Sequence, residues 1–202
     1  MSIVKGGGSI ASPGAGPPGW IDNWYYPTSA AIMDPGAKTL TTTTTRLYYI
    51  PFFVFNTHTF VNMAAYNSGT GDSGDILRLG IYSHHKDYGP RTLKKDWGAV
   101  TLDGSSKKLE PSSASTASLT MGWWWLAVHC SGNPILYAQK ALADGYGFMR
   151  GQAEFGVPAV DAATLDDINQ FPYVDTAYAA FATTAVAPTT STSVVPKVWL
   201  KA

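Results

Sequence analysis

The sequence predicts an all-β protein, an antiparallel β-sandwich that is jelly-roll-like, and three blocks of sequence carry this prediction. The blocks are RLYYIPFFVF at residues 46–55, ILRLGIY at residues 76–82 and GWWWLAVHCSG at residues 122–132. Each is a short run of aromatic and β-branched residues bounded by Gly, Pro, Asn or Ser, the usual pattern of strands and turns. We also expect an extended N-terminal arm and at most one short helix.

The composition favours one well-packed domain with a surface poor in charge. The chain has 202 residues, a length that one all-β domain accommodates, and 45% of them are hydrophobic. Only 14% are charged, and fourteen basic residues balance fourteen acidic ones. Because the charges cancel, we expect no overall field that attracts nucleic acid or an anionic membrane. A surface so poor in charge suits a protein that packs against copies of itself or other partners.

The two ends of the chain differ in composition from its middle. Residues 1–19 are rich in Gly and Pro and predict an arm, residues 20–182 predict the sandwich domain, and residues 183–202 predict a Thr/Ser/Pro-rich tail with a terminal apolar strand. The N-terminus carries no apolar segment typical of a signal peptide, so we expect synthesis in a host cytoplasm. No apolar run approaches the ~20 residues of a membrane-spanning helix, so we expect no membrane insertion. The single cysteine, Cys130, predicts a buried thiol and no internal disulfide.

The block at residues 46–55 is apolar on both faces, with Tyr48, Ile50, Phe52 and Val54 alternating against Leu47, Tyr49, Phe53 and Phe55. This pattern indicates either a central strand or a strand that takes part in an oligomer contact. Pro51 lacks a backbone donor and predicts a bulge or bend.

The other elements follow from alternation and turn residues. In residues 76–82 we expect Leu77, Leu79 and Ile81 in the core, and Arg78, Gly80 and Tyr82 facing outward. Further strands are expected at residues 59–66, 97–102, 107–109 and 134–139, and in the final VVPKVWLKA. Residues 160–170 are the one plausible helix, capped by Thr164 with Asp167 three residues later.

Catalytic chemistry is absent from the sequence pattern. No G-x-S-x-G, P-loop or G-x-G-x-x-G motif occurs, and most acidic residues fall in expected turns. His84 and His85 are adjacent and would point to opposite faces of a strand, which makes them poor partners for one metal ion. We therefore expect no enzyme activity, no cofactor and no metal site.

The aromatic residues leave three interpretations open. Consecutive Trp residues at 123–125 must alternate faces, so they do not all fit in one core. They could form a seam between subunits, fill the core, or provide a platform on which sugar rings stack. For contacts with copies or partners, the candidates are Leu47, Tyr49, Phe53, Phe55, Trp123 and Trp125; for glycan stacking, they are Tyr82, Tyr88 and Trp97.

Three features in this order resemble β-sandwich modules of tailed-bacteriophage virions, found as tail-fibre, head-fibre or capsid-decoration proteins. They are the strand 46–54 with its internal proline, RLGIY followed by a loop that closes at Gly89-Pro90, and GWWWLAV. The resemblance covers roughly residues 20 to 140. It implies a non-enzymatic structural protein of the virion, commonly a homotrimer, whose arm at residues 1–19 contacts other virion proteins.

The alternative is a receptor-binding, lectin-like module at a tail or fibre tip that recognises polysaccharide on the host surface. A third class, an enzyme that degrades polysaccharide, is disfavoured because the sequence offers no evident pair of catalytic carboxylates.

Overall fold

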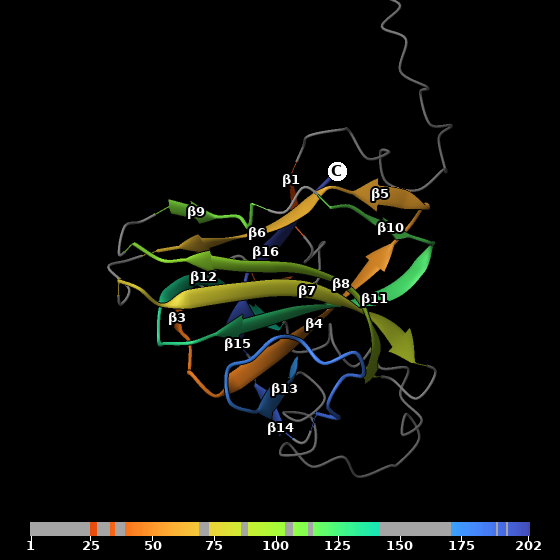
Figure 1. The fold of residues 1–202 in the computed structure, drawn as a ribbon. Helices are drawn as coiled ribbons and strands as arrows, with labels where there is room; N and C mark the ends of the chain where they lie inside the picture. Colours follow the sequence, from red (N-terminus) through yellow and green to blue (C-terminus); the bar gives the residue numbers. More distant parts are fainter. Residues whose placement is uncertain are drawn as a thin grey trace, which may run out of the picture.

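The computed structural model describes residues 25–27, 33–34, 39–68, 73–85, 89–103, 107–112, 115–141, 171–188, 190–192 and 194–202. Across these residues the chain is all-β, and two antiparallel sheets pack face to face as a sandwich, which confirms the predicted fold class (Figure 1). No helix occurs within these ranges. The predicted arm at residues 1–19, the predicted helix at residues 160–170 and Tyr88 lie outside them.

The larger sheet has eight strands. Its main path runs β1 (Tyr25–Pro27), β16 (Val198–Lys201), β6 (Asn62–Asn67), β12 (Ile135–Ala141) and β15 (Val194–Pro196). Two short strands, β2 (Met33–Asp34) and β3 (Thr39–Thr41), also pair with β12, and β9 (Lys107–Leu109) pairs with β6. The predicted terminal strand is therefore present, and β16 is paired on both sides, by β1 and by β6.

The second sheet has six strands in the order β14 (Thr190–Thr192), β13 (Phe171–Asp175), β4 (Arg46–Val54), β11 (Gly122–Cys130), β7 (Ile76–His85) and β8 (Gly89–Thr101). A separate ribbon joins β5 (His58–Phe60) to β10 (Ala117–Leu119). The chain crosses repeatedly between the sheets, from β4 to β6, from β6 to β7, from β8 to β9 and from β11 to β12. Such crossing is the jelly-roll-like feature of the topology.

The three blocks that predicted the fold become three adjacent strands. β11 lies between β4 and β7 and pairs with both, so that Leu126 is opposite Ile50 on one side and Ile81 on the other. This layer of β-branched and leucine side chains points into the space between the sheets. Sequence-distant blocks thus supply one continuous apolar surface.

The core between the sheets contains the residues that the alternating pattern of residues 76–82 predicts to be buried. Leu77, Leu79 and Ile81 are fully buried, as predicted, and face inner residues of the eight-stranded sheet such as Met63 and Leu200. Cys130 belongs to the same core, where burial raises the pKa of its thiol to about 12. The thiol is therefore protonated and unreactive at neutral pH.

Pro51 does not create the expected bulge. The register between β4 and β11 runs without a shift through the pair Trp125–Pro51. On the other side of β4, the described pairs with β13 stop at Tyr48. Pro51 therefore lies beyond the described hydrogen-bonded pairs between β4 and β13. Its missing N–H breaks none of these pairs, and β4 continues without a bulge.

The irregularity lies instead between β7 and β8. Their register shifts between Leu79 and Gly80 and twice more before His84, and Gly98 adopts a φ of 92°, a left-handed conformation that favours glycine. β7 also extends through His84 and His85, beyond the block at residues 76–82 that predicted this strand. The shifts twist β8 at the edge of the six-stranded sheet.

We expect Leu79→Ala to lower the free energy of unfolding by about 2–5 kcal/mol, because a fully buried leucine between two sheets leaves a cavity when truncated. Urea denaturation followed by tryptophan fluorescence measures the change. Val186→Ala is the control, since Val186 is 48% exposed and its truncation should cost well under that amount. Equal losses for both variants would contradict the assigned core.

Candidate functional site

The outer face of the six-stranded sheet carries most of the predicted contact residues. The register places Phe53 opposite Trp123, Pro51 opposite Trp125, Tyr49 opposite Ala127 and Leu47 opposite His129. On the β7 side, Trp125 is opposite Tyr82 and His129 is opposite Arg78. Tyr82 therefore points away from the sandwich core, as predicted, but the face on which it lies is not fully exposed to solvent.

A segment that we call the strap, residues 176–186, covers the part of this outer face that carries Leu47, Tyr49 and Tyr82. The strap leaves β13, crosses the sheet and reaches β8, where Thr184 forms a bridge with Thr92 (Figure 1). Backbone hydrogen bonds fix it there, from Leu93 N–H to the Thr183 carbonyl at 2.8 Å and from Ala185 N–H to the Arg91 carbonyl at 2.6 Å. The strap thus supplies from the same chain the cover that the sequence suggested a second subunit could provide.

Phe181 anchors the strap over a glycine. A Cβ atom added at Gly80 would lie 2.6 Å from Cε2 of Phe181 and 2.8 Å from the backbone oxygen of Lys95, so only glycine admits the ring at this distance. The Tyr82 hydroxyl donates a hydrogen bond of 2.8 Å to the carbonyl of Ala182. These contacts create a second apolar cluster outside the sandwich core.

The strap corrects several site predictions. Leu47, Tyr49 and Trp125 are at most 5% exposed and pack in this second cluster, so they do not present an open surface. Tyr82 lies on the outer face as predicted, but it is 1% exposed, so its ring is not an open platform for glycan stacking. Trp97 is 2% exposed and its indole N–H donates to the Ser115 carbonyl at 2.9 Å, so its ring does not serve as an open sugar platform.

At the other end of the outer face, the described residues leave several aromatic side chains partly exposed. Phe53 packs edge-on against both Phe55 and Trp123, with ring centroids 5.1 Å apart in each pair. Phe53 and Trp123 are half-buried, whereas Phe55 is 41% exposed. Met121, which precedes β11 where β4 ends, is 67% exposed. We call Phe53, Phe55 and Trp123 the aromatic end patch.

His84 packs on Trp125 of the outer face. Its imidazole stacks on Trp125 with an interplanar angle of 16°, and its Nδ1 accepts a hydrogen bond of 3.0 Å from the Trp125 indole N–H. Desolvation and the neighbouring His85 hold the pKa of His84 below its ordinary value. The neutral ring is therefore the form that accepts this hydrogen bond at neutral pH.

Beneath the strap, a second histidine is nearly inaccessible. His129 is 2% exposed, its ring centroid lies 5.1 Å from that of Tyr178, and Arg78 pairs with Asp96 nearby at 2.6 Å. Burial, reinforced by the positive charge of Arg78, lowers the pKa of His129, although the backbone of Thr176 partly opposes the shift. A cavity of about 60 Å³ adjoins it, far smaller than the ~300–1,000 Å³ of ligand pockets.

The eight-stranded sheet has an outer face that the sequence analysis did not identify. It carries four aromatic rings and three lysines: Tyr25, Tyr66, Tyr137, Trp199, Lys108, Lys197 and Lys201. We call this set the aromatic–lysine face. The alternation K-x-W-x-K at residues 197–201 is the sequence signal that would have indicated it.

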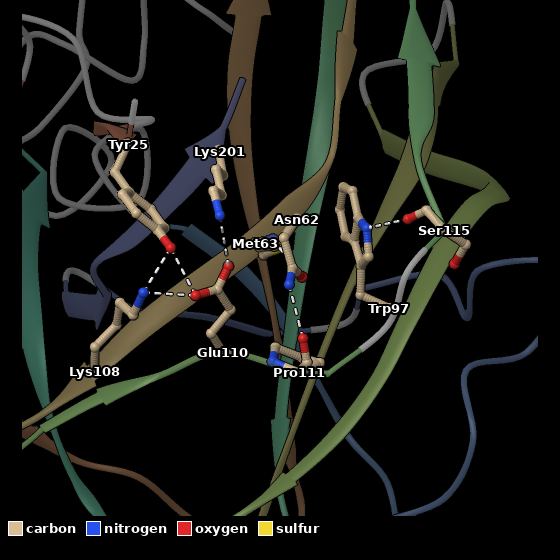
Figure 2. A network of polar contacts seen from close by, with 9 residues as sticks. All are labelled: Tyr25, Asn62, Met63, Trp97, Lys108, Glu110, Pro111, Ser115 and Lys201. Atoms are coloured by element: carbon tan, nitrogen blue, oxygen red, sulfur yellow. Dashed lines mark hydrogen bonds and ion pairs between the residues drawn. The ribbon is translucent and has the colours of Figure 1, made fainter. Parts of the chain in front are cut away.

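Glu110 connects three strands on this face (Figure 2). Its carboxylate accepts hydrogen bonds of 2.6 Å from the Tyr25 hydroxyl and from Lys108, and it lies 3.9 Å from the ammonium group of Lys201. Burial alone would raise the pKa of Glu110, but these hydrogen bonds and the two lysine charges lower it below its ordinary value. The ionised carboxylate therefore ties β1, β9 and β16 together.

Comparison with family models, curated proteins and solved structures finds no match to this chain. Within the described ranges, no three His, Cys, Asp or Glu side chains gather closely enough to hold a metal ion. The same ranges contain no helix long and apolar enough to cross a membrane. The outer surfaces of the two sheets are therefore the candidate sites of function.

Gly80→Ala should loosen the strap without breaking the sandwich core, because the added methyl group clashes with Phe181 and with a backbone oxygen. We expect destabilisation of roughly 1–3 kcal/mol, typical of overpacking, and faster proteolytic cleavage within residues 176–186. Gly89→Ala is the matched control, since its Cβ would meet nothing within 4 Å. An unchanged cleavage rate in Gly80→Ala would contradict the anchoring role of Phe181.

Stability should fall as pH decreases through the histidine range. The folded-state pKa values of His84 and His129 are lowered, so the unfolded chain binds more protons below its ordinary histidine pKa of ~6.5. Their contribution is complete well above that pH and is lost progressively as the pH falls below ~6.5. Urea denaturation at several pH values measures the slope, which His129→Gln should reduce. A slope that His129→Gln leaves unchanged would show that His129 does not contribute to it.

Proposed function

We propose that this chain is a non-enzymatic structural protein of a tailed-bacteriophage virion, a capsid-decoration, head-fibre or tail component that assembles as an oligomer. The observation that carries the proposal is the aromatic end patch, which the described residues leave partly exposed while the strap packs over Leu47, Tyr49 and Tyr82 on the same sheet face. The resemblance of the three strand blocks to virion modules supports the setting, and a homotrimer is the oligomer that this resemblance implies.

The patch is suited to association because its rings already pack against one another. Phe53 is held between Phe55 and Trp123, so little side-chain freedom remains to be lost when a partner covers them. Aromatic residues of this kind dominate the energetics of protein interfaces. Burying one such side chain fully contributes on the order of 1.5–3 kcal/mol.

The proposal uses three of the six predicted contact residues. Leu47, Tyr49 and Trp125 already pack within the chain and contribute by supporting the sheet beneath the patch. The arm at residues 1–19 remains part of the proposal as the segment that contacts other virion proteins. The glycan-binding alternative is not proposed at Tyr82 or Trp97, because both rings are buried.

Replacing the exposed hydrophobic residues of this end should shift the protein toward the monomer. We expect Phe55→Ser combined with Met121→Ser to reduce the mass measured by light scattering toward the 21.6 kDa of one chain. The control is Val186→Ser combined with Tyr137→Ser, two comparably exposed residues outside the patch, 48% and 43% exposed. A wild-type protein that is already a 21.6 kDa monomer at micromolar concentration would contradict the proposal.

A further inference from the structure

Lysine and aromatic side chains alternate along the outer face of β16. Val198 and Leu200 are in the sandwich core, so the residues between and beside them, Lys197, Trp199 and Lys201, point away from it. Lys197 lies just before β16, and three residues separate it from Lys201, so four steps of extended chain place the two lysines ~13 Å apart on either side of the indole. Two positive charges therefore lie along this extended segment, with the flat indole ring of Trp199 between them.

Neighbouring strands extend the same pattern across the sheet. Tyr25 on β1 pairs with Lys201, and Lys108 on β9 pairs with Tyr66 on β6. The ring of Tyr66 packs edge-on against that of Tyr137, with centroids 5.1 Å apart, and Tyr137 is 43% exposed. The aromatic–lysine face is therefore a surface of several strands and not a property of β16 alone.

The rings hold the lysine ammonium groups in place. Lys197 Nζ lies 5.5 Å from the centre of the Trp199 ring, while Lys108 and Lys201 lie 4.4 Å and 5.6 Å from the centre of the Tyr25 ring. Such cation–π contacts restrict long, flexible side chains at the surface. Positive charges fixed in this way lose less entropy when an anion binds.

The face has an excess of positive charge in a chain whose formal net charge is zero. Among the described side chains of this face, the three lysines are accompanied by one carboxylate, that of Glu110. Glu110 is shared by Lys108 and Lys201, which leaves Lys197 at the far end of β16 from that carboxylate. A ligand that complements this surface would carry several negatively charged groups at intervals along its length.

We propose that the aromatic–lysine face binds an acidic polysaccharide that lies along β16. Carboxylate or sulfate groups of the polymer pair with Lys197 and Lys201, and the apolar C–H faces of its sugar rings contact Trp199 and Tyr137. A nucleic acid fits less well, because the sequence pI of about 6.9 lies far below the pI above 9 typical of domains that neutralise many phosphates. The site is on the opposite sheet from the aromatic end patch and does not depend on the assembly role.

The experiment is affinity electrophoresis of the full-length protein through gels that contain alginate, dextran sulfate, neutral dextran or oligothymidylate. We expect alginate or dextran sulfate to retard the wild-type protein, with carboxylate and sulfate distinguished by the two polymers, and retardation to weaken as salt is added. Lys197→Gln combined with Lys201→Gln should weaken binding about threefold or more.

The control variant is Arg91→Gln combined with Lys94→Gln, which removes the same two charges from exposed positions on β8. Thermal unfolding checks that each variant is folded, and Lys197→Gln alone replaces the double variant if that one is not. Binding retained in the control and reduced in the β16 variant supports the site.

Four results would overturn it: no retardation of the wild type by either acidic polymer, equal retardation by neutral dextran, stronger binding to oligothymidylate, or equal loss in the control. Light scattering of the same samples reports the oligomer separately, so failure of this site and failure of the assembly proposal are distinguishable.

Discussion

The structure depends on a sheet that is apolar on both faces. β4 carries large apolar side chains on both faces, and Trp123 and Trp125 of β11 and Tyr82 of β7 lie beside it on the outer face, so each face must be removed from water. The eight-stranded sheet covers the inner face and the strap covers much of the outer one. Among the described residues, the aromatic end patch is a part of the outer face that stays partly exposed.

Covering a sheet with an irregular segment requires partners for that segment's backbone groups. The strap finds them at the edge strand β8, where Thr183 and Ala185 bond to Leu93 and Arg91, and at Thr45, whose carbonyl accepts from Thr176 N–H. These bonds also occupy part of an edge that would otherwise be open to pairing with another chain. One segment therefore buries aromatic side chains and protects the sheet edge.

The fold class and the inward-facing residues could be predicted because both depend on local alternation. The period-two pattern of residues 76–82 identifies its core residues directly, whereas residues 46–54 are apolar on both faces and their pattern identifies the strand alone. The fate of the outward residues was not predictable in the same way. Whether Tyr49 and Tyr82 meet solvent, another subunit or the same chain depends on Phe181, about 100 residues further along the sequence than Tyr82, and no local pattern encodes that contact.

The two histidine environments and the Glu110 network had no sequence signature for the same reason. His129 and Arg78 become neighbours only through strand register, and Tyr25 meets Glu110 across 85 residues of sequence. Pro51 illustrates the opposite case, in which a reliable local rule predicted a bulge that the pairing pattern made unnecessary. Local sequence patterns therefore predict the strands, whereas long-range pairing determines which residues their outward-facing side chains contact.

The position of β16 has a consequence for the order in which the molecule forms during translation. This strand lies between β1 and β6, which belong to the first third of the chain, yet it ends at residue 201. The eight-stranded sheet therefore stays divided until residue 201 has left the ribosome, and the inner face of β4, β11 and β7 lacks part of its cover until then. A nascent chain paused before that point would expose Leu79 and Ile81 to other hydrophobic surfaces, which makes it a natural client for chaperones.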